Sequence, residues 1–135
     1  MILKVEHIGI AVSSISNSNT LFSKLLGANP YKEERVNSEG VLTSFFQVGE
    51  TKIELVGSTK EGSAINKFLE KRGEGIHHLA FFVDNIDLEM NRLKKEGFQF
   101  INDEPKMGAD QKRIAFLHPK STNGVLIELC EDYEK

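Results

Sequence analysis

Short runs rich in Ile, Val and Phe alternate in this chain with segments whose apolar residues recur every three or four positions. The short runs are typical of β-strands and the longer spacing of helices. The predicted strands are residues 3–12, 31–36, 41–48 and 52–56 in the first half, and 75–83, 98–101, 112–117 and 125–130 in the second. Gly49 and Glu50 are predicted to form a tight turn between the third and fourth strands.

Three helices are expected between these strands. The first ends at Gly27 and has Ser16 or Ser18 as its N-cap. Its expected inward-facing side chains are those of Leu21, Phe22, Leu25 and Leu26. The second covers residues 63–72, with Ser63 as the cap and Ile65, Phe68 and Leu69 facing inward.

The third helix is expected to begin at the cap residue Asp87 and to end at Gly97. Leu88, Met90 and Leu93 supply its apolar positions. The following segment, residues 102–111, contains Pro105 and Gly108 and is long enough to form a lid over a binding site.

The two halves of the chain repeat one another. His7 and Val12 in the first strand correspond to His78 and Val83 in the fifth, both at a separation of 71 residues. The segment KIELV around Glu54 returns as LIELC around Glu128. Such repeats mark supersecondary units that pack against one another. The chain is therefore predicted to be one α+β domain, residues 1–135.

Each half is predicted to be a βαβββ module, and together the modules form a curved mixed sheet around a metal cleft. Module 1 covers about residues 1–60 and module 2 about residues 75–135, and a connecting helix covers about residues 63–73. Each module then carries a histidine on its first strand and a glutamate on its last strand.

These four residues could ligate a divalent metal ion. Two imidazoles and two carboxylates form a mixed nitrogen and oxygen donor set that suits Co, Ni, Mn or Zn. Successive strand residues face opposite ways, so only one of His77 and His78 can share a site with His7, and the repeat selects His78. Ile and Leu residues flank both Glu54 and Glu128, so each glutamate is expected to face away from its apolar neighbours. A histidine on a strand or a glutamate between two aliphatic residues can equally be structural, and His77 and His118 are interpreted in that way.

Composition and net charge bear on the class of protein and on its expected location. The net charge of −3 argues against a nucleic-acid-binding protein, and no apolar stretch resembles a membrane span or a signal peptide. The cytoplasm is therefore the expected location. The single cysteine, Cys130, cannot form an internal disulfide and is interpreted as an apolar filler.

Five segments resemble the vicinal oxygen chelate superfamily, which includes the glyoxalase and bleomycin-resistance proteins, and within it the methylmalonyl-CoA epimerases. The segments are HIGIAV (7–12), GETKIEL (49–55), GEGIHHL (73–79), DEPKMGA (103–109) and AFLHPKSTNGVLIEL (115–129). The resemblance implies metal ligation by His7, His78 and Glu128, with Glu54 at a position where relatives carry Gln or Glu. It also implies a homodimer. Some epimerases have a catalytic glutamate near the position of Thr43, which cannot be a general base.

An epimerase of this kind removes and returns the α-proton of an acyl-CoA. Glu128 and Glu54 are the predicted bases, on opposite sides of a planar enolate, with Glu39 as a weaker alternative to Glu54. The CoA phosphates require a local basic cluster, for which the candidates are Lys106, Lys112, Arg113 and Lys120. Two alternatives stay open, a lactoylglutathione lyase (glyoxalase I) and a non-catalytic protein that sequesters a small molecule.

Overall fold

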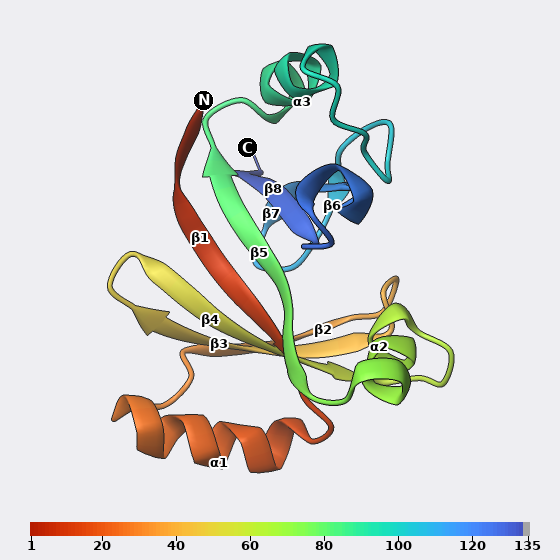
Figure 1. Ribbon diagram of the computed structural model, residues 1–135. Helices are drawn as coiled ribbons and strands as arrows, with labels where there is room; N and C mark the ends of the chain where they lie inside the picture. The colour runs from red at the N-terminus through yellow and green to blue at the C-terminus, as the bar shows by residue number, and fades with distance from the viewer. Residues whose placement is uncertain (134–135) are drawn as a thin grey trace. The chain divides into compact units, whose positions relative to one another are not determined.

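A computed structural model describes residues 1–133 (Figure 1). In chain order the elements are β1 (Ile2–Ala11), α1 (Ile15–Leu26), β2 (Lys32–Val36), β3 (Val41–Val48), β4 (Thr51–Ser58), α2 (Ala64–Arg72), β5 (Gly75–Val83), α3 (Ile86–Lys95), β6 (Lys106–Met107), β7 (Lys112–Leu117), the 3-10 turn η1 (Pro119–Thr122) and β8 (Ile127–Asp132). This order contains the two predicted βαβββ modules, and the predicted α+β class is confirmed.

The chain forms two compact units. Unit 2 is residues 8–77, and unit 1 is residues 1–7 together with the chain from His78 onward. β1 and β5 pass from one unit into the other, because the divisions fall inside them.

Unit 2 is built on the strand order β2-β3-β4-β1. β2, β3 and β4 are antiparallel, and the tight turn at Gly49 is confirmed by its positive φ of 61°. Phe46 and Leu55 face the same side of the sheet and pack with Phe22 of α1. Ile65 of α2 joins a separate cluster with Val56.

Unit 1 has the strand order β1-β5-β8-β7-β6. β5 and β8 are parallel, whereas β7 is antiparallel to both β8 and β6. One face of these strands packs against α3 through a buried cluster: Val83, Ile86, Met90, Leu93, Ala115, Leu117 and Leu129. The other face carries buried polar residues beside a second apolar cluster, which consists of Ala80, Ile114 and Cys130 with Phe82 and Phe116. No helix among the described residues is long and apolar enough to cross a membrane.

Two of the three predicted helix caps are wrong. Ser14, not Ser16 or Ser18, caps α1, and Asn85, not Asp87, caps α3. Ser63 caps α2 and Gly27 ends α1 as predicted. The errors arise because Ser, Asp and Asn are all good caps, so the sequence does not choose between neighbouring candidates.

The apolar positions of two helices are also partly wrong. Leu21 and Leu25 of α1 and Leu88 of α3 are 62%, 70% and 64% exposed. Met90 and Leu93 are buried as predicted. Helical spacing alone predicted too many inward-facing residues on each helix, because the strands underneath cover only part of the helix surface.

The sixth strand differs from the prediction. Residues 98–101 contribute only an isolated bridge between Phe100 and Leu117, and the strand forms at Lys106–Met107 inside the predicted lid loop. Gly108 lies close to Ile114, since a Cβ at this glycine would approach the Cδ1 atom of Ile114 to 2.6 Å. Part of the segment 102–111 is therefore packed on β7.

The cap of α3 supports a direct stability test. The Asn85 side chain accepts a hydrogen bond from the Leu88 backbone N–H at 3.0 Å. Asn85→Ala is expected to lower the free energy of unfolding by about 1 kcal/mol, because that N–H loses its partner. Asp87→Ala, the matched control, removes only a 3.4 Å ion pair with Arg113 and is expected to cost less. Urea unfolding measures both, and a larger loss for Asp87→Ala would contradict the assignment.

Candidate metal centre

Strand register brings two predicted ligands to one face of unit 1. Ala80 of β5 pairs with Glu128 of β8, and paired residues of adjacent strands face the same side. His78 precedes Ala80 by two residues and so shares this face. Ile127 and Leu129, the neighbours of Glu128, pack on the opposite face in the α3 cluster. Glu128 faces away from its apolar neighbours, as predicted.

His7 of β1 completes a group of three side chains. Its Nε2 atom lies 3.1 Å from the Nε2 atom of His78, and the two rings meet edge to face with centroids 5.1 Å apart. The Oε1 atom of Glu128 lies 3.3 Å from His78 Nε2 and 3.6 Å from His7 Nε2. Three of the four predicted ligands therefore converge within unit 1.

This donor set fits a divalent cation. Ligands bound at about 2.1 Å to one ion lie about 3–3.5 Å apart, which is close to the 3.1–3.6 Å between these three atoms. The side chains are buried, with exposures of 6% for His7, 6% for His78 and 4% for Glu128. Imidazole nitrogens and a carboxylate oxygen suit first-row divalent metals. The three residues thus have the chemistry and the spacing of metal ligands.

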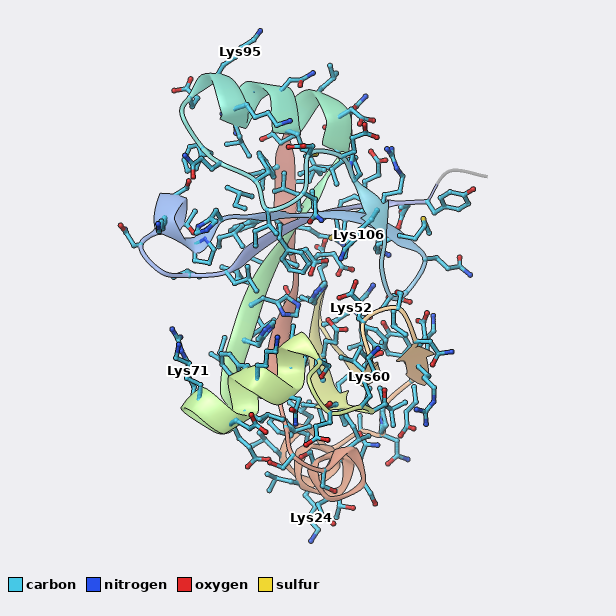
Figure 2. The ribbon with its side chains drawn as sticks, turned by 90° about the vertical axis from the view of Figure 1, so that its right-hand side faces the viewer. Lys24, Lys52, Lys60, Lys71, Lys95 and Lys106 are labelled. Carbon is cyan, nitrogen blue, oxygen red and sulfur yellow. The ribbon has the colours of Figure 1, made fainter. Side chains whose placement is uncertain are left out.

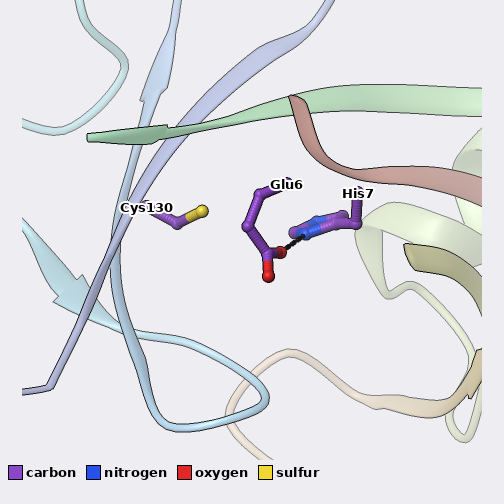
Figure 3. A group of neighbouring side chains, drawn as sticks. All are labelled: Glu6, His7 and Cys130. Carbon is purple, nitrogen blue, oxygen red and sulfur yellow. Dashed lines mark hydrogen bonds and ion pairs between the residues drawn. The ribbon is translucent and has the colours of Figure 1, made fainter. Parts of the chain in front are cut away.

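Glu6 is a fourth buried polar residue at this group, and sequence reasoning missed it. Its Oε1 atom lies 2.5 Å from the Nδ1 atom of His7, and its exposure is 4% (Figure 3). Neighbouring residues of a strand normally face opposite sides, so strand alternation did not place Glu6 with His7. The available signal was a carboxylate next to a predicted ligand, because metal-binding histidines usually donate their second ring N–H to such a group.

Cys130 lies on the same face, close to Glu6 and His7 (Figure 3). It is fully buried, and its thiol donates a hydrogen bond to the Phe81 carbonyl at 3.5 Å. Burial, aided by the negative charges of Glu128 and Glu6, holds the pKa of this thiol well above its usual value. Cys130 is therefore a protonated, buried side chain, in agreement with its interpretation as a filler.

Glu54 belongs to unit 2, where it is 6% exposed on β4. It pairs with Phe45 of β3, and Thr43 pairs with Val56. Glu54 is thus the diagonal neighbour of Thr43 on the same face, opposite to the face that packs on α1. Its neighbours Ile53 and Leu55 belong to the α1 cluster, so Glu54 faces away from them as predicted. Its roles as ligand and base stay predictions.

The predicted phosphate-binding residues differ in their surroundings. Lys112 is 8% exposed and its Nζ atom lies 3.0 Å from a carboxylate oxygen of Asp132. Arg113 contacts Glu131 at 2.7 Å as well as Asp87. Lys120 is exposed at η1, and Lys106 is half-buried on β6 (Figure 2). All four lie in unit 1, and their role stays a prediction.

The other two histidines have structural contacts. Within unit 2, the rings of His77 and Phe68 of α2 pack edge to face, with their centroids 4.9 Å apart. His118 caps η1, and its Nδ1 atom accepts a hydrogen bond from the Lys120 backbone N–H at 3.1 Å. Both agree with the structural interpretation made from the sequence.

Residues 6–116 match the model of the glyoxalase/bleomycin resistance protein/dioxygenase superfamily. A curated relative, the ethylmalonyl-CoA/methylmalonyl-CoA epimerase of Cereibacter sphaeroides, is 39% identical over 131 residues, which cover 96% of this chain and 98% of the relative.

Two solved structures have nearly the same fold. The methylmalonyl-CoA epimerase of Mycobacterium tuberculosis has a TM-score of 0.93 and 34% identity, covering 97% of this chain and 89% of its own. A variant of the Streptomyces coelicolor methylmalonyl-CoA epimerase, in complex with 2-nitronate-propionyl-CoA, has a TM-score of 0.94 and 31% identity. That match covers 98% of this chain and 96% of the Streptomyces chain.

Proposed function

Because this chain belongs to the methylmalonyl-CoA epimerase family of the glyoxalase/bleomycin resistance/dioxygenase superfamily, it is an isomerase of acyl-CoA substrates, and we propose that it interconverts (2R)- and (2S)-methylmalonyl-CoA with the aid of one divalent metal ion. The observation that supports metal dependence is the convergence of His7, His78 and Glu128 at 3.1–3.6 Å. A relative that binds a CoA ligand supports the substrate class.

His7, His78 and Glu128 would hold the ion, with Glu54 as the fourth protein ligand. A bound Co, Ni, Mn or Zn ion supplies a Lewis acid that draws electron density from the thioester oxygen. Burial of these ligands keeps bulk water away from the reacting groups. Fixed groups then stabilise a negative charge that develops on the substrate more strongly than they would in water.

The proton transfers are assigned to two carboxylates. One takes the α-proton from one face of the acyl group, and the other returns a proton to the opposite face of the planar enolate. We assign these roles to Glu128 and Glu54, which occupy equivalent strands of the two modules. Thr43 has no basic group at neutral pH, and its hydroxyl donates to the Glu34 carbonyl at 2.9 Å. Glu54, on the same face of unit 2, is the carboxylate that compensates.

The CoA phosphates are assigned to the basic side chains of unit 1. Among the four candidates, Lys120 is the most exposed and Lys106 is half-buried. Lys112 and Arg113 already hold ion pairs with acidic residues, so their contribution would be to the local potential. The proposal also includes a cytoplasmic homodimer. The free thiol of Cys130 fits a reducing compartment.

Proton exchange in D2O tests the proposed activity. The protein is expected to incorporate deuterium at the α-carbon of methylmalonyl-CoA and to interconvert its epimers, as followed by NMR. Removing divalent ions with a chelator should lower both rates by at least about 100-fold, since a charge-stabilising group is lost. Adding back Co²⁺ should restore them. Exchange that continues unchanged in chelator would contradict metal dependence.

The same samples distinguish the alternatives. Turnover of the hemithioacetal of glutathione and methylglyoxal, without deuterium uptake into methylmalonyl-CoA, would identify a glyoxalase I. Binding of methylmalonyl-CoA with neither reaction would favour a sequestering protein. The family membership and the buried carboxylates favour the epimerase.

A further inference from the structure

The contact between Glu6 and His7 joins two consecutive buried polar residues of β1. Their exposures are 4% and 6%, and the bond joins Glu6 Oε1 to His7 Nδ1 at 2.5 Å. Burying a carboxylate without a hydrogen-bond partner lowers stability. The contact with His7 gives the buried carboxylate of Glu6 such a partner. The other nitrogen of the same ring, Nε2, faces His78 and Glu128.

The chemistry of this bond determines the tautomer of His7. An ionised carboxylate only accepts hydrogen bonds, so the hydrogen in the contact is the Nδ1–H of the imidazole. A neutral imidazole with its hydrogen on Nδ1 has a lone pair on Nε2. The bond also restricts rotation of the ring, and Nε2 is kept among the other donors.

We propose that Glu6 is a positioning residue for the metal centre, whose carboxylate holds His7 as the Nδ1–H tautomer with its Nε2 lone pair directed at the ion. The inference deepens the proposed function and rests on its metal ion. Glu6 acts through His7 and does not touch the substrate.

Cys130 does not take over this role or turn the group into a second metal site. Glu6, His7 and Cys130 offer ligand atoms within 4.8 Å of one another, which is close enough for a shared ion. A thiol must lose its proton to ligate a metal, whereas that of Cys130 donates its hydrogen to the Phe81 carbonyl. The bond from His7 to Glu6 is therefore the functional part of the group.

Two substitutions at Glu6 and one matched control test the proposal. Glu6→Gln removes the charge, and its amide N–H can donate to Nδ1 and stabilise the tautomer that blocks Nε2. Glu6→Asp keeps a carboxylate on a shorter side chain. Glu89→Gln is the control, because Glu89 is a buried glutamate of unit 1 with 2% exposure that contacts Arg92 on α3, away from the metal ligands.

The first measurement is the tautomer of His7 in the metal-free protein, by correlation of its ring ¹⁵N and ¹H resonances. Wild type and Glu89→Gln are expected to show Nδ1–H, and Glu6→Gln to show a mixture or mainly Nε2–H. The second is the dissociation constant for Co²⁺, from competition with a chelator. Glu6→Gln is expected to raise it by about 10–100-fold, the usual loss when an outer partner of a metal ligand is removed. Glu6→Asp should recover part of this loss.

An unchanged tautomer and unchanged Co²⁺ affinity in Glu6→Gln would overturn the proposal. So would equal losses of affinity in Glu6→Gln and Glu89→Gln, because that result describes a general loss of stability. A wild-type protein that binds Co²⁺ but fails to epimerise methylmalonyl-CoA would overturn the proposed function and leave the expected effects of Glu6→Gln unchanged. The two failures are therefore distinguishable.

Discussion

Replacing His78 with alanine is expected to cause large losses of metal affinity and epimerase activity while leaving the protein folded. His78 Nε2 lies 3.1 Å from His7 Nε2 and 3.3 Å from Glu128 Oε1, so its loss leaves two of the three donors described in unit 1. Affinity for Co²⁺ should fall by more than about 100-fold, because even outer partners of metal ligands contribute about 10–100-fold. The value of kcat/KM should fall by at least about 10²–10³-fold. Chelator competition and an epimerisation assay measure the two effects.

The adjacent histidine is the matched control. His77 packs on Phe68 in unit 2, and His77→Ala is expected to keep both Co²⁺ binding and activity. Thermal unfolding separates folding from binding. Co²⁺ at 100 times its dissociation constant should stabilise wild type and His77→Ala by about 2.7 kcal/mol and leave His78→Ala unchanged. Full activity in His78→Ala would refute the metal centre.

Replacing Glu54 with glutamine is expected to separate metal binding from proton transfer. The amide oxygen of Gln can still ligate a cation, whereas the amide is not a general base. Epimerisation should fall by about 10²–10⁴-fold, the usual contribution of a general base. With Glu128 intact, one epimer of methylmalonyl-CoA should still exchange its α-proton in D2O without inverting, and the other should be inert. NMR of each epimer in D2O measures this difference.

Glu128→Gln supplies the opposite case, in which the reactive and inert epimers should be exchanged. A further variant tests the compensation between Thr43 and Glu54, which are diagonal neighbours on one face. Adding Thr43→Glu to Glu54→Gln should restore part of the lost rate, with circular dichroism to confirm that the new carboxylate has not unfolded the sheet. Wild-type epimerisation by Glu54→Gln alone would show that Glu54 is not a base.

Much of the candidate metal centre could be predicted from the sequence because its geometry follows strand alternation. A strand places every second side chain on one face, so the repeat of His7 as His78 located two donors, and the apolar neighbours of Glu128 indicated its direction. Glu6 could not be found in this way. Its bond to the residue directly after it departs from alternation and depends on how the side chains pack.

The boundaries of helices and strands were also predicted only in part. The ends of β3, β7 and α2 agree closely with the predictions. Before α1 and α3, several residues are suitable N-caps, and only the tertiary structure shows which of them caps the helix. The short strand β6 formed inside the predicted lid because the close approach of Gly108 to Ile114 joins this segment to β7.

The sequence by itself therefore determined the order of elements, the duplication and the residue types of the candidate metal centre, because these depend on local spacing and on periodicity along one chain. Only the tertiary structure decided which side of each helix is covered, which Lys and Arg side chains already hold acidic partners, and that a carboxylate lies against His7. Those outcomes depend on contacts between segments far apart in sequence, whose energies no local pattern contains.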